Sequence, residues 1–307
     1  MSTQITEAFV QQYSANVMML SQQQGSRLEP KVRQESQKSK AQFFDRIGTV
    51  SAVRRTGRHA ATPQLDTPHS RRMVTLEDYE WADLVDDQDK IRMLIDPTSQ
   101  YAIAAAWAFG RSKDDVIIAA SVGSAYAGEA GATAVVHPDA QKFAATTGAA
   151  FSNLNVYTLR KVKAMMDADE VIGKRYFVCT SSQIDAMLGE TQVTSADYNS
   201  VKALVQGEVN SFMGFEFIRT ERVGLTTSTT ATVATGVVGA GVSLTGTNRA
   251  CFAFAEQGLL LSKGEDFVTK MSERDDKGYA MQVYARMSIG GTRMEEEQVV
   301  EVICKEA

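Results

Sequence analysis

The sequence predicts an α+β fold, and three observations carry that prediction. After Pro97, an alanine-rich run continues to Val122 with residues that favour helix. From about Phe151 onward, apolar residues at helical spacing and short apolar runs typical of buried strands follow one another. Near the end of the chain, apolar and polar residues alternate from Tyr279 to Gly290, as in a strand with one buried face.

The first of these elements is expected to be one long helix over Pro97–Val122. Asp96 precedes it with a side chain that suits the capping position. Gly110 is a candidate kink, and Ser112 with Asp115 has the spacing of a capping box. We therefore expect one long helix that ends near Gly123 and is either straight or bent at Gly110.

Residues 1–45 are rich in Gln, Ser and charge, yet they carry one narrow apolar stripe. Its members recur at helical spacing: Ile5, Phe9, Tyr13, Val17 and Leu20. A single amphipathic helix on a polar tether cannot bury its apolar face alone, so it must dock on another surface. That surface is either the chain's own domain or a neighbouring subunit, and we favour the neighbour.

Residues 46–90 are expected to form one long two-stranded hairpin that joins two opposed charge blocks. Val50–Val53 leads into the hairpin and Met73–Leu76 leads back, with turn-forming residues between them. The basic block comprises Arg46, Arg54, Arg55, Arg58, Arg71 and Arg72. The acidic block comprises Glu77, Asp78, Glu80, Asp83, Asp86, Asp87 and Asp89. A basic arm joined to an acidic segment can pair with the opposite block of an identical neighbour.

The second half of the chain predicts helices and strands in alternation. Helices are expected over Leu154–Asp167, from a cap at Thr180 or Ser181 through Leu188, and over Val201–Phe212. Short strands are expected at Tyr176–Cys179, Phe215–Ile218 and Cys251–Phe254, with a surface loop or hairpin over 225–248. Phe267–Met271 and Val299–Cys304 are both expected to pair alongside the final alternating strand.

Composition excludes several classes of protein. The chain has 307 residues, of which 44% are apolar and 22% charged, and this is typical of a globular protein with a substantial core. A net charge of −5 argues against a sequence-specific nucleic-acid binder. Cys179, Cys251 and Cys304 are far apart, which favours reduced thiols over a disulfide framework. No stretch has the pattern of a signal peptide or a membrane span, so we expect a soluble cytoplasmic product that does not bind membranes.

The residues that could support catalysis are few, and their pattern predicts no enzyme, metal site or cofactor. His59, His69 and His137 lack partners at metal-ligand or triad spacing and are expected to be surface or loop residues. Glu295–Glu297 is expected on a solvated turn. Cys179 lies within an apolar run and is expected to be a small core residue.

Two local motifs and the order of the predicted parts carry a family resemblance. The first motif runs through Gly110-Arg111, Asp114-Asp115, Ile117-Ile118-Ala119-Ala120, Gly123, Gly128-Glu129 and Gly131. The second is the passage Gly207–Ile218. On these residues the chain resembles the Hong Kong 97-type major capsid proteins of tailed bacteriophages, over essentially its whole length.

The resemblance implies a subdomain layout. Residues 1–45 would be the N-terminal arm, 46–90 the extended E-loop hairpin, 91–123 and 262–307 the peripheral P-domain with its long spine helix, and 124–261 the axial α/β A-domain. It also implies that the subunit forms hexamers and pentamers in an icosahedral phage head. Such a virion shell assembles in the host cytoplasm and encloses double-stranded DNA, which it contacts non-specifically.

Two departures from the family pattern shape the expected partners. Some members crosslink a Lys of this hairpin to a neighbouring Asn, but the chain has no Lys between Arg46 and Leu76. We therefore expect non-covalent stabilisation. The sequence begins directly at the N-terminal arm, so any scaffolding protein is expected to be a separate chain. Cement and portal proteins are also expected to be separate.

The contacts between subunits are expected to use both charge blocks together with aromatic side chains. The residues concerned are Arg46, Arg54, Arg55, Arg58, Arg71, Arg72, Glu77, Asp78, Glu80, Asp83, Asp86, Asp87, Phe9, Tyr13 and Trp81. Three other interpretations stay open. They are a soluble α/β enzyme with an unrecognised site, a nucleic-acid-binding module that uses the arginines on phosphate, and a shell protein of a bacterial encapsulating compartment.

Overall fold

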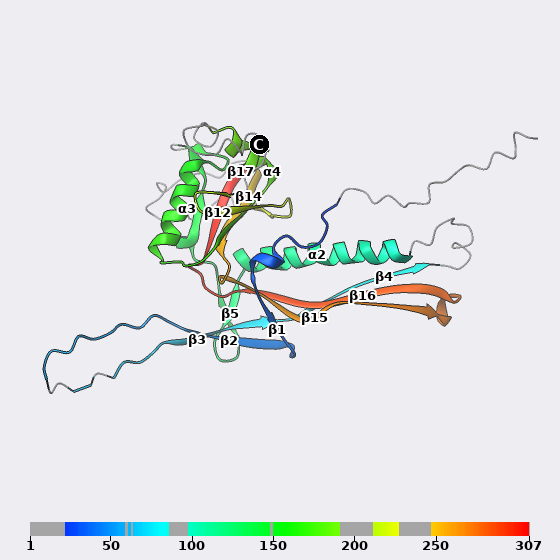
Figure 1. Cartoon of the computed structure of the whole chain (residues 1–307), viewed down its shortest axis with the longest axis horizontal. Coiled ribbons are helices and arrows are strands. Elements are labelled where there is room, and N and C mark those ends of the chain that lie inside the picture. The colour runs from blue at the N-terminus through cyan, green and yellow to red at the C-terminus, as the bar shows by residue number, and fades with distance from the viewer. Residues whose placement is uncertain are drawn as a thin grey trace, which may run out of the picture. The chain divides into compact units, whose positions relative to one another are not determined.

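The structure is a computed structural model that describes residues 22–58, 61–62, 64–85, 98–147, 150–190, 211–226 and 247–306. The chain divides into two compact units (Figure 1). Of the described residues, unit 1 takes 22–26, 78–85, 98–111 and 265–288, and unit 2 takes the rest. Both mix helix and strand, as the sequence predicts.

Unit 1 is built from parts of four elements. They are β4 (Glu77–Val85), α2 (Thr98–Val122), β15 (Leu259–Arg274) and β16 (Ala280–Arg293). The alternation predicted over Tyr279–Gly290 is confirmed from Val283 to Ile289, where every second residue is buried, but not at its start, because Tyr279 is exposed and Ala280 is buried. Phe109 of α2 meets Phe267 of β15 edge to face, with ring centroids 5.5 Å apart. The β15–β16 hairpin turns through η5 (Asp275–Lys277).

The long strands form a four-stranded sheet in the order β1-β15-β16-β4. Strand β1 (Arg33–Ser36) runs parallel to the part of β15 that belongs to unit 2. Phe267–Met271 lies in β15, next to β16 as predicted. The same prediction for Val299–Cys304 is wrong, because β17 (Val299–Glu306) pairs antiparallel with β14 (Thr247–Ala255) in another sheet. Most of β17 is buried regardless of the face its side chains point to, which suits the middle of a covered sheet.

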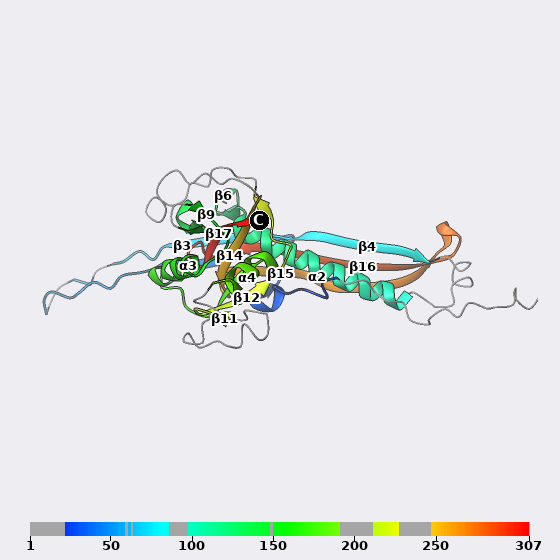
Figure 2. The same cartoon turned by 90° about the horizontal axis from the view of Figure 1, so that it is seen from above.

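The main sheet of unit 2 has seven strands, and two of them, β14 and β17, are labelled in Figure 2. In order they are β11 (Ser211–Phe212), β12 (Phe215–Arg219), β10 (Arg175–Cys179), β14, β17 and β7 (Lys142–Ala144), with β13 (Leu225–Thr226) paired to β14. The predicted strands at Tyr176, Phe215 and Cys251 are all confirmed. Phe177, Phe215 and Val302 lie in its hydrophobic core.

Helices α3 (Val156–Ala168) and α4 (Ser181–Leu188) cover this core and confirm two further predictions. Leu159 and Met166 of α3 and Met187 of α4 are fully buried in it. Asn155 caps α3 because its side chain accepts a hydrogen bond from Thr158 N at 2.8 Å. Thr180 occupies the capping position of α4.

A second sheet of unit 2 has the order β2-β3-β5-β6. Its strands are β2 (Ala41–Ile47), β3 (His69–Thr75), β5 (Ala125–Ala127) and β6 (Thr133–Val135), and β8 (Thr146–Thr147) with β9 (Ala150–Phe151) forms a separate ribbon. Short 3-10 turns occur at η2 (Glu29–Lys31) and η3 (Asp139–Gln141).

The predicted hairpin over 46–90 needs correction. A hairpin exists, but its strands are β2 and β3, so it begins at Ala41, and Val50–Val53 lies outside both strands. The described acidic residues lie on β4, which belongs to a different sheet. Strand β4 has a partly buried side of its own, at Tyr79 and Trp81, and this gives it a reason to leave the hairpin. The two charge blocks are therefore not on one hairpin.

The long helix is confirmed over Thr98–Val122, although the predicted capping box at Ser112 and Asp115 is wrong, because both lie inside the helix. The carboxylate of Asp114 instead accepts the backbone N–H groups of Arg27 and Leu28 at 3.1–3.2 Å. Gly110 serves close approach: a Cβ there would lie 2.4 Å from the carbonyl carbon of Gly25.

Some predictions lie outside the described residues. These are the N-terminal helix, the Asp96 cap, most of the helix expected over Val201–Phe212 and most of the loop over 225–248. The described end of the helix expected over Val201–Phe212 is strand β11 (Ser211–Phe212), which contradicts the helix prediction at those two residues. Within the described residues, no helix is long and apolar enough to cross a membrane.

Candidate functional site

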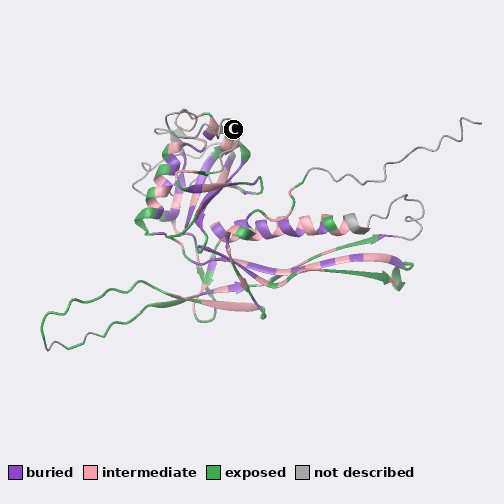
Figure 3. Ribbon diagram, in the orientation of Figure 1, coloured by how far each residue is buried: buried purple, intermediate pink, exposed green. Residues whose placement is uncertain are grey.

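The segment between β2 and β3 is the most exposed part of unit 2, and we call its described residues 48–58, 61–62 and 64–68 the arm (Figure 3). Every one of them is exposed, and none is in a strand or helix. Val50 and Val53 are 62% and 57% exposed although both are apolar. A chain segment with this much open backbone and apolar surface gains little from its own body.

The arm carries three exposed arginines, Arg54, Arg55 and Arg58, which we call the tip arginines. Arg55 donates to the carbonyl oxygens of Gly57, at 2.8 Å, and of Arg58, both on the arm itself. Within the described part of the chain, no carboxylate pairs with any of the three. Their charge is therefore open to an external partner.

Two features hold the base of the arm to unit 2. Arg71 pairs with Asp45 at 3.2 Å and lies over the ring of Phe43. The second feature is close packing under the β2–β3 hairpin. Gly290 of β16 passes so close to β3 that a Cβ on Gly290 would lie 2.3 Å from the carbonyl oxygen of Thr75. A side chain at 290 would push the ribbon away from the strand below it.

The strongest anchor is a cluster of three arginines around one carboxylate, Glu296, which we call the charge hub. Arg72 is 2% exposed, and its guanidinium donates to Glu296. Arg46 and Arg293 approach the same carboxylate, with N–O distances of 3.6 and 3.8 Å. The hub thus connects β2, β3, the end of β16 and the turn before β17.

Arg293 also ties the hub to the end of α2. Its fully buried guanidinium donates to the carbonyl oxygens of Ser121 and Gly123, at 3.0 and 2.8 Å, and to that of Val135 at 3.3 Å. Carbonyls at a helix C-terminus carry partial negative charge, so a cation is favoured there. One side chain thereby fixes the positions of α2, β6 and β16 within unit 2.

Burial sets the electrostatics of the hub. Desolvation lowers the pKa of Arg72 and of Arg293, and the negative charge of Glu296 opposes that shift in both. An arginine side chain stays protonated under all ordinary conditions. The hub therefore holds permanent buried positive charge that Glu296 compensates most strongly, with smaller effects from Glu297 on Arg72 and from Glu301 on Arg293.

The described members of the acidic block lie along β4. Glu77, Asp78, Glu80 and Asp83 are all exposed, and Trp81 beside them is partly buried. Within unit 1, Asp78 accepts a hydrogen bond from the hydroxyl of Ser288, and Glu80 accepts one from Tyr284. Phe9, Tyr13, Asp86 and Asp87 lie outside the described residues.

The structure thus sorts the predicted basic residues into three sets. Arg46 and Arg72 meet at the hub, and the burial of Arg72 commits it to its own chain. The tip arginines extend on the arm, and Arg71 pairs locally with Asp45.

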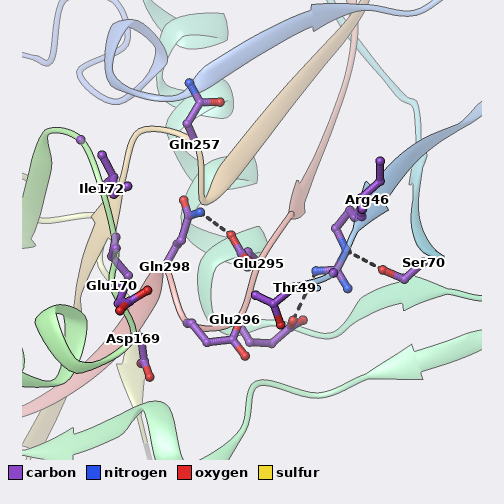
Figure 4. A pocket seen from close by; sticks show the side chains of 15 residues that line it. Arg46, Thr49, Ser70, Asp169, Glu170, Ile172, Gln257, Glu295, Glu296 and Gln298 are labelled. Carbon is purple, nitrogen blue, oxygen red and sulfur yellow. Dashed lines mark hydrogen bonds and ion pairs between the residues drawn. The ribbon is translucent and has the colours of Figure 1, made fainter. Parts of the chain in front are cut away.

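A groove of about 790 Å³ opens beside the base of the arm (Figure 4). Arg46 and Ser70 line one side, Asp169, Glu170 and Ile172 line the other, and the turn 295–298 lies between them. Its rim carries the carboxylates of Asp169, Glu170, Glu295 and Glu297. Ile172 is 87% exposed, so the groove is acidic with an apolar wall.

The histidines differ in their exposure to solvent. His69 is exposed at the start of β3, and His59 lies outside the described residues. His137 lies in a loop, which is one of the two expected settings, and within that loop it is buried, at 1% exposed. Neither of its ring nitrogens makes a hydrogen bond of good geometry to a described residue, although an interaction with the backbone of Gln141 opposes part of the effect of burial on its pKa. Burial, with the nearby charge of Arg293, lowers its pKa to about 4, so His137 is neutral at pH 7.

The remaining chemistry is that of a packed core. Cys179, Cys251 and Cys304 are free and buried, and burial raises the pKa of Cys179 well above its ordinary value, which keeps it a thiol. The core position predicted for Cys179 is confirmed. In the described part of the chain, no group of three His, Cys, Asp or Glu residues is placed to hold a metal ion.

Sequence reasoning missed the hub and the groove. Glu296 was predicted on a solvated turn, yet its side chain is 14% exposed and it compensates two buried arginines. One signal was present, because Arg293 follows a long half-buried strand with Gly290-Gly291 just before it. A charged residue that directly continues a half-buried strand indicates a buried partner of opposite charge.

Comparison with known proteins finds capsids. A family model described as phage capsid protein matches residues 5–306. The chain is similar to the capsid structure of the cyanophage P-SCSP1u, with TM-score 0.72, 16% identity, and coverage of 100% of this chain and 96% of that one. It is also similar to the capsid of Ralstonia phage GP4 (TM-score 0.71, 10% identity, 97% and 96% covered) and of cyanophage Pam1 (0.69, 15%, 98% and 97%). No curated protein matches the sequence.

Proposed function

The chain belongs to the phage capsid protein family, and from that premise we propose that it is the major coat subunit, which self-assembles through its exposed arm. Hexamers and pentamers of the subunit build an icosahedral head that encloses double-stranded DNA. The role is structural, with no catalytic step. The observation that carries the proposal is the arm itself, an exposed basic segment with apolar residues that its own unit leaves uncovered.

The proposed subdomain layout follows the family resemblance, with two revisions. Residues 1–45 serve as the N-terminal arm, the region 46–90 contains the E-loop, 91–123 with the long strands of 262–307 forms the P-domain, and 124–261 the A-domain. Because β17 pairs with β14, we assign residues 299–306 to the A-domain sheet. Because β2 begins at Ala41, the E-loop hairpin extends to that residue.

The contacts that close the shell are weak individually. Exposed ion pairs contribute about 0–1 kcal/mol each, so a tip arginine alone holds nothing. Repeated around a ring of subunits, such contacts sum to a stable shell while single contacts stay reversible. Scaffolding, cement and portal proteins are further partners in this proposal, and assembly takes place in the host cytoplasm.

The test is to express the full chain alone and image it by negative-stain electron microscopy, with size-exclusion chromatography in parallel. Closed particles or ring-shaped capsomers are expected, and they should weaken as salt rises from about 0.1 to 1 M because exposed charges are screened. A solitary monomer at high protein concentration, with the arm protected from proteolysis, would contradict the proposal.

A further inference from the structure

We propose that the acidic groove beside Glu296 is the receptor for the tip arginines of a second copy of the chain. The inference rests on the proposed assembly function and deepens it by naming where the arm docks. Three observations carry it: the arm's unsatisfied charge, the groove's complementary charge and apolar wall, and the direction in which the arm leaves its own groove.

The arm presents the right chemistry for a narrow acidic site. In an extended chain, side chains alternate between two sides. Val53 and Arg55 therefore share one side and Arg54 takes the other, before the chain bends at Gly57 and turns at Arg58. Such a segment offers a guanidinium to each wall of a groove and an apolar side chain to one of them. Guanidinium groups form forked hydrogen bonds with carboxylates, which makes them suited to this rim.

The groove presents the matching surface. None of its rim residues Asp169, Glu170, Glu295 and Glu297 forms an ion pair with a described residue. Asp169 and Glu295 accept hydrogen bonds from Gln141 and Gln298, which are neutral donors and leave the negative charges uncompensated. The volume of about 790 Å³ falls within the usual range for sites that hold a ligand, about 300–1,000 Å³. Ile172 supplies an apolar contact for Val53.

The occupant is another copy because the groove's own arm leads away from it. Residues 46–49 form part of the groove wall, and the chain then continues outward through Val50-Ser51-Ala52-Val53. For Arg54 to return to the same groove, those four residues would have to reverse the chain. They contain neither Gly nor Pro, and their β-branched members favour extended backbone. A DNA occupant is disfavoured because the carboxylates of the rim would repel phosphate.

The first experiment reverses charge on each side separately. The arm variant is Arg54→Glu/Arg55→Glu/Arg58→Glu, and the groove variant is Glu170→Lys/Glu297→Lys. Each alone should lower particle yield at least about tenfold. When both sets of substitutions are combined in one chain, every acidic arm meets a basic groove, in rings of five as in rings of six, so particles should return.

Controls keep this result interpretable. The variant Asp185→Lys/Glu273→Lys changes net charge as much as the groove variant, at exposed acids outside the groove, and should assemble normally. Circular dichroism and thermal melting show that each variant folds. If the unaltered chain forms neither particles nor capsomers, the assembly function itself fails. If it does and the groove variant matches it, the groove inference fails while assembly stands.

A second experiment locates the contact directly. The three native cysteines are fully buried, so an introduced surface thiol has no competing exposed native thiol. Particles from a mixture of Thr56→Cys and Ile172→Cys chains, oxidised mildly, should give a covalent dimer at twice 33.5 kDa on a non-reducing gel. Thr56→Cys mixed with Asp185→Cys should not.

The outcomes of the crosslinking experiment decide the occupant. The expected heterodimer supports docking of a second copy. In a chain carrying both Thr56→Cys and Ile172→Cys, a fast-migrating monomer with an internal disulfide, and no dimer, would show that the arm fills its own groove and would overturn the proposal. Equal dimer formation with Asp185→Cys would overturn it as well, because it would show contact without specificity.

Discussion

The base and the tip of the arm use the same residue type in opposite ways. At the base, Arg72 is buried and bound to Glu296 inside its own chain. At the tip, Arg54, Arg55 and Arg58 are exposed and have no carboxylate partner among the described residues. The arginine charge at the base therefore fixes where the arm starts, through its ion pair within the chain. The tip keeps its charge for a partner.

The difference teaches that an arginine cluster in sequence is not one functional unit. What separates the two sets is Glu296, which lies 224 residues beyond Arg72 in the chain. Local sequence around the arginines gives no hint of it. An arginine that is buried against an acid from elsewhere in the sequence stabilises its own chain. An arginine without such an acid nearby stays exposed and available for assembly.

The largest effect should come from removing the carboxylate of the hub. Glu296→Gln removes the main counter-charge of the buried Arg72 and Arg293, which should cost about 3–5 kcal/mol of unfolding free energy. Urea denaturation of the full chain measures it. Glu297→Gln, at the exposed neighbouring position, should stay within about 0.5 kcal/mol. Equal effects from the two variants would show that the hub is not a special site.

A somewhat smaller effect should come from acid. His137, near Arg293 and Lys142, has a folded-state pKa of about 4 against 6.5 when unfolded. The unfolded chain therefore binds the proton more readily. The stability from neutral His137 is fully present above pH 6.5 and is lost as pH falls through 4, by about 3 kcal/mol between pH 7.5 and pH 4. His137→Leu should flatten this part of the stability–pH curve, whereas His69→Leu, at an exposed site, should leave it unchanged.

A further test concerns the ribbon below the arm. Gly290→Ala places a Cβ 2.3 Å from the carbonyl oxygen of Thr75, so β3 must move away from β16. We expect a loss of about 1–3 kcal/mol in unfolding free energy, typical of overpacking. Gly57→Ala, in the open arm where a Cβ meets nothing within 4 Å, is the matched control and should have little effect. If both substitutions are neutral, the ribbon is less closely packed than the distances imply.

The smallest effect on the isolated subunit should come from the tip. Each substitution Arg54→Ala, Arg55→Ala or Arg58→Ala should change the unfolding free energy by no more than about 0.5 kcal/mol, because nothing packs on these side chains. Thermal melting of unassembled subunit measures this. A loss comparable to that from Glu296→Gln would mean that base and tip do not differ as the structure indicates.

Much of the fold could be predicted because its elements carry strong local patterns. Helix α2, the alternating strand β16 and the helices α3 and α4 were all expected close to their observed bounds. The partner of a strand was harder to predict. Val299–Cys304 was recognised as strand but assigned to the wrong sheet, because a short apolar run has no feature that names its neighbour.

The candidate site was predictable in part for the same reason. The exposed basic arm follows from composition and turn residues, which are local. The groove draws on residues 46–49, 169–173 and 295–298, and the sequence offers no reason to group them. The burial of His137 could not be predicted, because in sequence a buried loop histidine looks like any other loop histidine.

Residue order alone establishes that this chain alternates helices and strands around an apolar core and carries a protruding basic segment, since periodicity and charge are written locally. Tertiary structure decides which arginines are buried, which strands share a sheet and which acids gather into one groove. Those outcomes depend on contacts between residues far apart in the chain, where burial changes the energy of a charge by more than any neighbouring residue does.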